Sequence, residues 1–235
     1  MSGTRHGFQL LDGAALEALD PRRFRRTRPF PWWAGPVLRQ EAWRALQARL
    51  PAPDSFARVF GKKRRFGQQS HDRYTLDYEP DLPVHPIWHQ LVEELESPAY
   101  RRFLRQRLGR RPFELCFHWH YTPRGASVSP HCDAARKLGS QVFYFNDEAT
   151  WDPAWGGETC VLDDGGRYSH RSNPDFADFD ALETVPATGN QSLLFARRGH
   201  SWHGVRELTC PEGELRRVFI MAVESTGSWW RRPRS

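Results

Sequence analysis

Hydrophobic and polar positions along this chain follow two different periods in its two halves. Apolar residues recur at helical spacing over residues 41–50, 87–95 and 100–108, and the last of these segments is followed by Gly109. Pro-rich stretches connect these segments. The pattern predicts a mostly helical region over residues 1–110.

From about residue 112 the pattern changes to short runs of β-forming residues separated by clusters of Gly, Pro, Asp and Asn. Many short strands after a helical block are typical of an antiparallel barrel or sandwich that helices buttress on one face. We therefore expect an α+β protein with one domain, made of a helical support region (1–110), a β-core (111–226) and a basic tail (227–235). The predicted strands are residues 113–121, 141–147, 158–162, 191–196, 202–206 and 216–224.

The composition fits a folded protein and gives little reason to expect binding of nucleic acid. Of 235 residues, 39% are hydrophobic and 13% aromatic, which is typical of a globular chain. The net charge is +6, but only three of the 34 basic residues are lysines, so the excess of arginine resembles a compositional bias. Binding of nucleic acid requires basic residues gathered on one face, and the basic run 62–65 is expected to be a solvated loop.

Cysteine spacing and hydropathy bear on the expected cellular location of the protein. The four cysteines form no C-x-x-C pair, which argues against both a zinc knuckle and a disulfide framework. The first residues lack the apolar segment of a signal peptide, and no stretch approaches 18 apolar residues. We expect a reduced, cytoplasmic protein with no membrane partner.

A His-x-Asp motif carries the strongest chemical signal. His131 and Asp133 are two residues apart, so an extended or turning chain directs both side chains to the same side. His203 follows 72 residues later, beside Gly204 and at the start of a predicted strand, and His200 is its alternative. Two histidines and one carboxylate on one face of a metal leave three open positions, as in non-haem Fe(II) oxygenases.

An arginine on the last predicted strand offers a site for an anion. Arg217 shares one face with Phe219, Met221 and Val223 by alternation, and a guanidinium on an apolar face matches a carboxylate bidentately. Arg216 is the alternative for this role. Alternation also directs His118 and His120 away from the face of Tyr121, which predicts packed or hydrogen-bonded side chains on the outer face.

These motifs together resemble the Fe(II)- and 2-oxoglutarate-dependent dioxygenases, above all their prolyl 4-hydroxylase-like branch, over residues 113–224. The motifs that carry the resemblance, in chain order, are Tyr121, His131-x-Asp133, Val142–Asn146 with Tyr144, Trp155-Gly-Gly-Glu158, His203-Gly-Val and Arg217. The interval from His203 to Arg217 is longer than the family's usual one, so Arg216 remains an alternative for the carboxylate-binding role.

The resemblance implies a double-stranded β-helix (jelly-roll, cupin-like) barrel and a cofactor set of Fe(II), 2-oxoglutarate and O₂. It implies that His131, Asp133 and His203 bind iron and that Arg217 pairs with the 5-carboxylate of 2-oxoglutarate. It also implies that Tyr144 and Tyr121 line the cosubstrate pocket.

The expected activity is hydroxylation of an aliphatic C–H bond on a prolyl, peptidyl or small-molecule substrate. The alternative is a cupin-like metal-binding or sensor protein without turnover. A nucleic-acid dealkylase of the same superfamily is disfavoured. The similar enzymes of that class carry a second arginine several residues after the first on the same strand, and here Met221, Ala222 and Val223 occupy that stretch. The sequence leaves open the substrate, the oxidative outcome, the oligomeric state and the role of the loop 163–184, a candidate lid.

Overall fold

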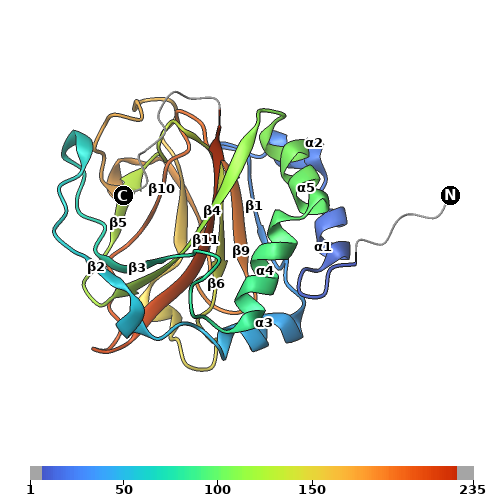
Figure 1. Ribbon diagram of the computed structural model, residues 1–235. Helices are drawn as coiled ribbons and strands as arrows, with labels where there is room; N and C mark the ends of the chain where they lie inside the picture. The colour runs from blue at the N-terminus through green and yellow to red at the C-terminus, as the bar shows by residue number, and fades with distance from the viewer. Residues whose placement is uncertain (1–6, 227–235) are drawn as a thin grey trace.

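Two antiparallel β-sheets and a layer of helices make up residues 7–226, the part of the chain that the computed structural model describes (Figure 1). The helices gather on one side of the larger sheet, and β5 and β10 of the smaller sheet lie on the other side. The basic tail predicted at 227–235 falls outside the described residues. No helix within 7–226 is long and apolar enough to span a membrane.

The larger sheet contains seven strands in the order β1-β9-β6-β11-β4-β3-β2. Its centre is the long pair β11 and β4, which align over eleven residue pairs from Leu215–Pro123 to Ser225–Phe113. The bounds are β1 Trp32–Gly35, β9 Ser192–Ala196, β6 Lys137–Tyr144, β11 Leu215–Ser225, β4 Phe113–Pro123, β3 Arg73–Asp77 and β2 Ala57–Val59.

The smaller sheet contains four strands in the order β5-β10-β7-β8. Among the described residues no strand pairing joins it to the larger sheet, so the strands form two separate sheets there. Its strands are β5 Val128–His131, β10 His203–Val205, β7 Thr159–Asp163 and β8 Ala181–Val185. The expected mixed fold with antiparallel sheets is therefore confirmed at this level.

Local sequence explains where the helices begin and end. Ser97 closes one helix and caps the next, where its hydroxyl accepts a hydrogen bond from Tyr100 N and Pro98 occupies the first turn. Gly109 ends that second helix with a φ of 115°. The helices are α1 Gly13–Ala18, α2 Pro21–Arg26, α3 Gln40–Gln47, α4 Pro86–Glu96 and α5 Pro98–Leu108, with short 3₁₀ turns at Pro53–Ser55, Arg65–Gly67, Pro153–Trp155 and Phe176–Asp178.

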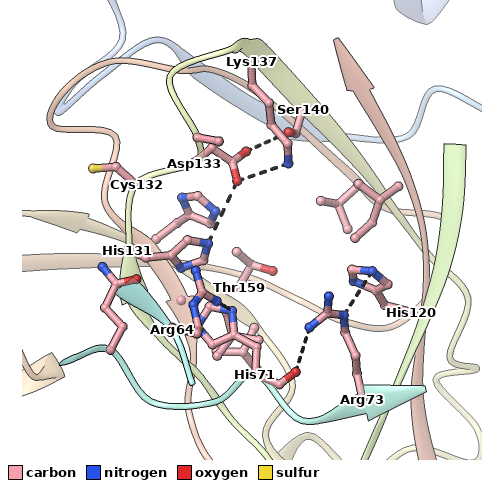
Figure 2. A pocket seen from close by; sticks show the side chains of 18 of the residues that line it. Arg64, His71, Arg73, His120, His131, Cys132, Asp133, Lys137, Ser140 and Thr159 are labelled. Atoms are coloured by element: carbon pink, nitrogen blue, oxygen red, sulfur yellow. Dashed lines mark hydrogen bonds and ion pairs between the residues drawn. The ribbon is translucent and has the colours of Figure 1, made fainter. Parts of the chain in front are cut away.

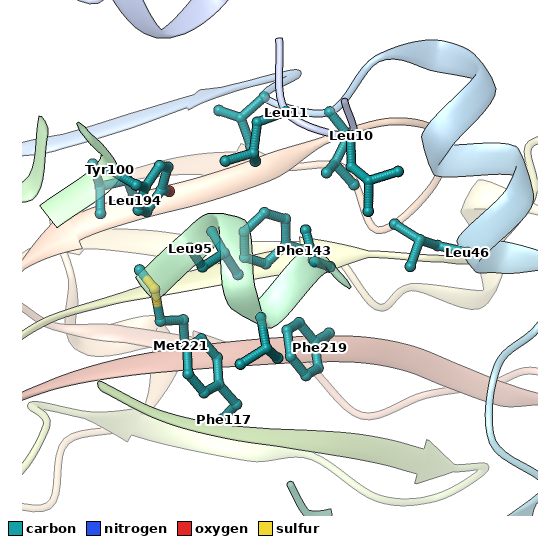
Figure 3. Close-up of a cluster of buried hydrophobic side chains, with 14 of the residues drawn as sticks. Leu10, Leu11, Leu46, Leu95, Tyr100, Phe117, Phe143, Leu194, Phe219 and Met221 are labelled. Carbon is teal, nitrogen blue, oxygen red and sulfur yellow. The ribbon is translucent and has the colours of Figure 1, made fainter. Parts of the chain in front are cut away.

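One face of the larger sheet forms the main hydrophobic core with the helices. Leu95 of α4 packs in one cluster with Phe143 of β6, Leu194 of β9 and Phe219 of β11 (Figure 3). Trp43 of α3 also donates a hydrogen bond to the carbonyl of Tyr144, at 2.8 Å. The helical layer thus fixes the larger sheet from behind and leaves the opposite face to the smaller sheet.

Alternation along β11 sorts its side chains between two environments. Phe219 and Met221 enter the core with the helices, whereas Val218 belongs to the cluster between the sheets, with Ile220 against it. Arg216 has the same parity as Val218 and Ile220, and these three side chains line a cavity on that face. The face of β11 that carries Phe219 and Met221 is therefore the helix-covered face.

Sequence and structure differ in the N-terminal region. Residues 1–110 supply β1, β2 and β3 as well as five helices, so the description of this region as mostly helical misses three strands. These strands pair at the edges of the larger sheet, with β1 on β9 and β3 on β4. The strands β5 and β8 are also absent from the prediction, because each lies in a stretch rich in Pro, Gly or Asp.

Candidate active site

A cavity of about 720 Å³ lies against the face of the larger sheet that the helices leave free. Side chains from β4, β5, β6, β7, β10 and β11 line it, together with residues 62–68 and the pair His170–Arg171. The segments come from all parts of the chain, and the strand pairings place them around one space (Figure 2).

Two histidines far apart in the chain meet in the smaller sheet. His131 ends β5, His203 begins β10, and the antiparallel pairing of these strands sets the two residues directly opposite each other. Their ring centroids are 4.4 Å apart. Asp133 follows β5, and one ligand atom from each of the three residues lies within 4.8 Å of the others. The structure therefore brings together the three residues that the sequence predicts as metal ligands.

Backbone carbonyls orient both imidazoles. Nδ1 of His131 lies 3.0 Å from the carbonyl oxygen of Ser129, and Nδ1 of His203 lies 2.9 Å from that of Ser201. A carbonyl can only accept, so the Nδ1 atoms carry the protons and each Nε2 keeps a lone pair for a metal. Burial lowers the pKa of both imidazoles, and for His131 the neighbouring His203 lowers it further. Both rings are accordingly neutral, the form that binds metal.

Asp133 is held as a carboxylate. Its Oδ2 accepts a hydrogen bond of 2.8 Å from Ser140 Oγ, and its Oδ1 lies 3.2 Å from Nζ of Lys137. Burial on its own raises the pKa of Asp133, but the charge of Lys137 and the hydrogen bond from Ser140 act in the opposite direction, and that pKa is well below its ordinary value. A charged, fixed carboxylate beside two neutral imidazoles is a suitable donor set for a divalent metal.

Arg216 lies in the same cavity, with its guanidinium held by neutral acceptors. Nε donates to the carbonyl of Gly157, and Nη2 donates to Thr159 Oγ1 at 3.1 Å. Tyr144, whose ring lies 5.5 Å below the guanidinium carbon, donates its own hydroxyl to the same Thr159 oxygen at 2.7 Å. Arg216 is only 5% exposed, and burial lowers its pKa. A buried guanidinium that pairs with no carboxylate of residues 7–226 is suited to an anionic ligand.

The assignment of the cavity arginine to Arg217 is wrong, and so is the placing of Tyr121 in the pocket. Arg217 and Tyr121 are cross-strand neighbours on the opposite face of the sheet. The Tyr121 ring stacks on Phe56 within the main core, and its hydroxyl donates to the carbonyl of Pro51 at 3.0 Å. Alternation grouped Arg217 with Phe219 correctly, but that apolar face contacts the helices and the cavity lies on the other face. Arg216, the alternative, lines the cavity.

Several cavity residues are missing from the sequence prediction. His118 and His120 do lie opposite Tyr121, as expected, but their face is the cavity wall and not an outer face. Burial lowers the pKa of His118 to about 3 and that of His120 well below its usual value, so both rings are neutral. His71 and Arg64 come from the loop before β3, and only the folded chain brings that loop to the cavity.

Comparison with known proteins gives a consistent answer. Residues 117–222 match the family model described as the 2OG-Fe(II) oxygenase superfamily. The matched segment contains His131, Asp133, His203 and Arg216. No curated protein sequence matches the chain.

Solved structures resemble the fold at low sequence identity. A prolyl-4-hydroxylase from Pseudomonas putida is 20% identical with a TM-score of 0.60, over 83% of this chain and 92% of that one. HygX from Streptomyces hygroscopicus, solved with nickel, 2-oxoglutarate and hygromycin B, is 14% identical with a TM-score of 0.55, over 85% of each chain. A Trichoplax adhaerens prolyl hydroxylase bound to a peptide of hypoxia inducible factor is 12% identical with a TM-score of 0.54, over 79% of this chain and 76% of that one.

Proposed function

We propose that this chain, an enzyme of the 2OG-Fe(II) oxygenase superfamily, uses Fe(II), 2-oxoglutarate and O₂ to hydroxylate an aliphatic C–H bond of its substrate. The observation that carries the proposal is the convergence of His131, Asp133 and His203 in a cavity that also contains the buried, carboxylate-free Arg216. We further propose that residues 111–226 form a jelly-roll oxygenase core, that residues 1–110 support it within one domain, and that the enzyme acts in the cytoplasm.

The donor set fits Fe(II). Two neutral imidazoles present their Nε2 lone pairs, because both Nδ1 atoms are engaged by carbonyl groups, and Asp133 supplies one negative charge. Three protein ligands on one side leave open positions for a chelating cosubstrate and for O₂. Ser140 fixes the carboxylate, and such support of a ligand tunes metal affinity.

Arg216 fits the distal carboxylate of 2-oxoglutarate. Two of the five N–H groups of its guanidinium are used by Gly157 and Thr159, so three remain to bind an anion. The Thr159 hydroxyl already accepts from Arg216 and Tyr144, which leaves its own proton free to donate to the same anion. We propose that Tyr144 acts through Thr159 and that Arg217 and Tyr121 have no part in cosubstrate binding.

The residues of the cavity would hold the metal, orient the cosubstrate and shield the reacting groups from water. When bound, Fe(II) would activate O₂, which is the oxidant, and 2-oxoglutarate would supply two of the four electrons by its conversion to succinate and CO₂, the other two coming from the substrate C–H bond. His131, Asp133 and His203 fix the metal, and Arg216 fixes the cosubstrate at its far end. Val142, Val218 and Ile220 cover the wall between them with apolar surface, which keeps water away from the reacting groups.

Succinate release tests the proposal. With Fe(II) and 2-oxoglutarate, the purified chain is expected to release succinate in the presence of a substrate, and Asp133→Ala should abolish release because iron loses its only anionic ligand. A protein that binds both iron and 2-oxoglutarate yet releases no succinate across amino acids, peptides and metabolites would instead be the metal-binding protein without turnover.

A further inference from the structure

The cavity wall is strongly cationic beyond what metal and cosubstrate require. Ten lysine and arginine residues line it, against only two carboxylates, Asp72 and Asp133. Arg216 is assigned to the distal carboxylate of the cosubstrate, and Lys137 pairs with Asp133. Arg136 pairs with Glu224 at 2.9 Å. A large positive excess therefore remains at the end of the cavity formed by residues 62–73.

Two half-buried arginines, Arg64 and Arg73, carry part of this excess positive charge. Arg64 bonds to His71 Nδ1 through Nη1, and Arg73 donates to the carbonyl of His71 at 2.8 Å and to His120 Nε2 at 3.2 Å (Figure 2). All of these partners are neutral, and within residues 7–226 neither guanidinium forms an ion pair. Burial lowers the pKa of both arginines, and Arg73 lowers that of Arg64 further.

The Arg64 guanidinium lies next to an imidazole that packs on one of the proposed metal ligands. The ring of His71 packs edge-to-face on the ring of His131, with centroids 4.7 Å apart, and its Nε2 is 3.2 Å from Ser129 Oγ. Arg64 is thus separated from a metal ligand by one imidazole. An anionic group held by Arg64 and Arg73 would lie close to the reaction centre, within the length of a small molecule.

Two loops that contribute residues to the cavity are joined to each other by hydrogen bonds. Gln68 Nε2 donates to the carbonyl of Ser172 at 3.4 Å, and Asn173 Nδ2 donates to the carbonyl of Gly67 at 3.1 Å. These bonds join the loop that carries Arg64 to the segment 163–184. A cavity of about 720 Å³, shared with 2-oxoglutarate, has the size of a small-molecule pocket.

From these contacts we infer that the substrate is a small anionic molecule whose carboxylate or phosphate group is bound by Arg64 and Arg73, which directs a nearby C–H bond to the metal centre. The inference rests on the proposed function for the reaction itself. Binding of the anion depends only on the two guanidinium groups, so the two claims can fail separately. His71 and His120 are positioning residues, because each holds a guanidinium through a hydrogen bond.

A binding experiment addresses the anion site without turnover. Protein loaded with Zn(II) and saturated with 2-oxoglutarate, so that Arg216 is occupied, is titrated with inorganic phosphate and separately with acetate by calorimetry. The wild type should bind at least one of the two, and the better ligand identifies the substrate's anionic group. The double variant Arg64→Gln/Arg73→Gln should weaken that binding by about 100-fold, which is roughly tenfold for each guanidinium. Arg102→Gln, on the exposed face of α5, is the matched control and should bind as the wild type does.

A turnover experiment addresses the substrate. A succinate-release screen uses matched pairs, a phosphate monoester with its alcohol and a carboxylic acid with its amide. Only the charged members should couple, and the double variant should lower kcat/KM for them by about 100-fold while the KM for 2-oxoglutarate stays unchanged. Arg64→Lys/Arg73→Lys should recover part of the loss, because it restores charge without the forked geometry.

Three results would overturn the inference. One is equal coupling by neutral and charged members of a pair. Another is coupling only by an acidic peptide or a nucleic acid. The third is a double variant that binds phosphate and acetate as the wild type does, or that loses 2-oxoglutarate instead. If no variant or wild-type sample releases succinate while anion binding behaves as expected, the proposed function fails and the anion site stands.

Discussion

Arg216 donates a hydrogen bond of 3.1 Å to Thr159 Oγ1, and this contact links β11 of the larger sheet to β7 of the smaller sheet at the cavity wall. It fixes a buried guanidinium whose remaining N–H groups face the cavity. The adjacent Arg217 lies on the opposite face of β11 and does not line the cavity. Neighbouring arginines in one strand are thereby given different environments, which makes them a natural pair for mutation.

Arg216→Ala is expected to raise the KM for 2-oxoglutarate by about 100-fold or more, because two charge-assisted hydrogen bonds to a carboxylate are lost. Arg217→Ala should leave that KM within about twofold of the wild type. Initial rates of succinate release at varied 2-oxoglutarate measure both. A larger effect at Arg217 than at Arg216 would reverse the assignment.

Gly157→Ala tests how closely the chain approaches Arg216. Gly157 has a φ of 97°, and a Cβ there would lie 3.3 Å from Cδ of Arg216. We expect a loss of about 1–3 kcal/mol in the free energy of unfolding and a raised KM for 2-oxoglutarate. Gly213→Ala is the control, since its φ is 89° but a Cβ would meet nothing within 4 Å. It should lose stability by urea unfolding without any change in KM, and a parallel change in KM would remove the link between Gly157 and Arg216.

Ser140→Ala removes the hydrogen bond that orients the Asp133 carboxylate. Hydrogen bonds to metal ligands of this kind typically change metal affinity by about 10–100-fold, and we expect a loss at the lower end of that range. Competition of Fe(II) with a chelator of known affinity gives the value. An unchanged affinity would mean that Lys137 alone orients the carboxylate.

Stability should fall as the solution is acidified below neutral pH. His118 has a pKa of about 3 in the folded chain, because burial and the charges of Lys137 and Arg73 disfavour its protonated form, although Asp133 favours it. In the unfolded chain the imidazole has its ordinary pKa of about 6.5. Between these values the unfolded state binds more protons, so the free energy of unfolding decreases as pH falls through about 6.5 towards 3.

Urea midpoints at pH 7.5 and pH 5.5 measure this slope. His118→Asn removes one titrating group from the cavity wall and should make the fall between the two pH values shallower. A slope identical to that of the wild type would show that His118 is protonated equally in the folded and unfolded states.

The sequence predicted that His131, Asp133 and His203 come together for a local reason and a topological one. His131 and Asp133 are two residues apart, and the interval to His203 is long enough for a strand to return. The sequence favoured Arg217 over Arg216 as the anion-binding arginine and could not decide between them securely, since each begins one of two apolar faces of β11. The choice between the faces depends on which one the helices cover, and that is a property of packing between distant segments.

The same limit applies to the rest of the cavity. His118 and His120 were expected opposite Tyr121, which is correct, but alternation cannot tell a cavity wall from a solvent face. Arg64 and His71 reach the cavity through a loop without periodic structure, so no pattern places them. Strands β1, β2 and β3 were missed because they are only three to five residues long and lie within a region whose strongest signal is helical.

The central claim is that His131, Asp133 and His203 hold one Fe(II) that binds 2-oxoglutarate, and anaerobic absorbance spectroscopy tests it most directly. Adding 2-oxoglutarate to the Fe(II)-loaded wild-type protein should produce a visible metal-to-ligand charge-transfer band. His203→Ala should fail to produce it at the same concentrations. A band of equal intensity in His203→Ala, or no band in the wild type, would contradict the account.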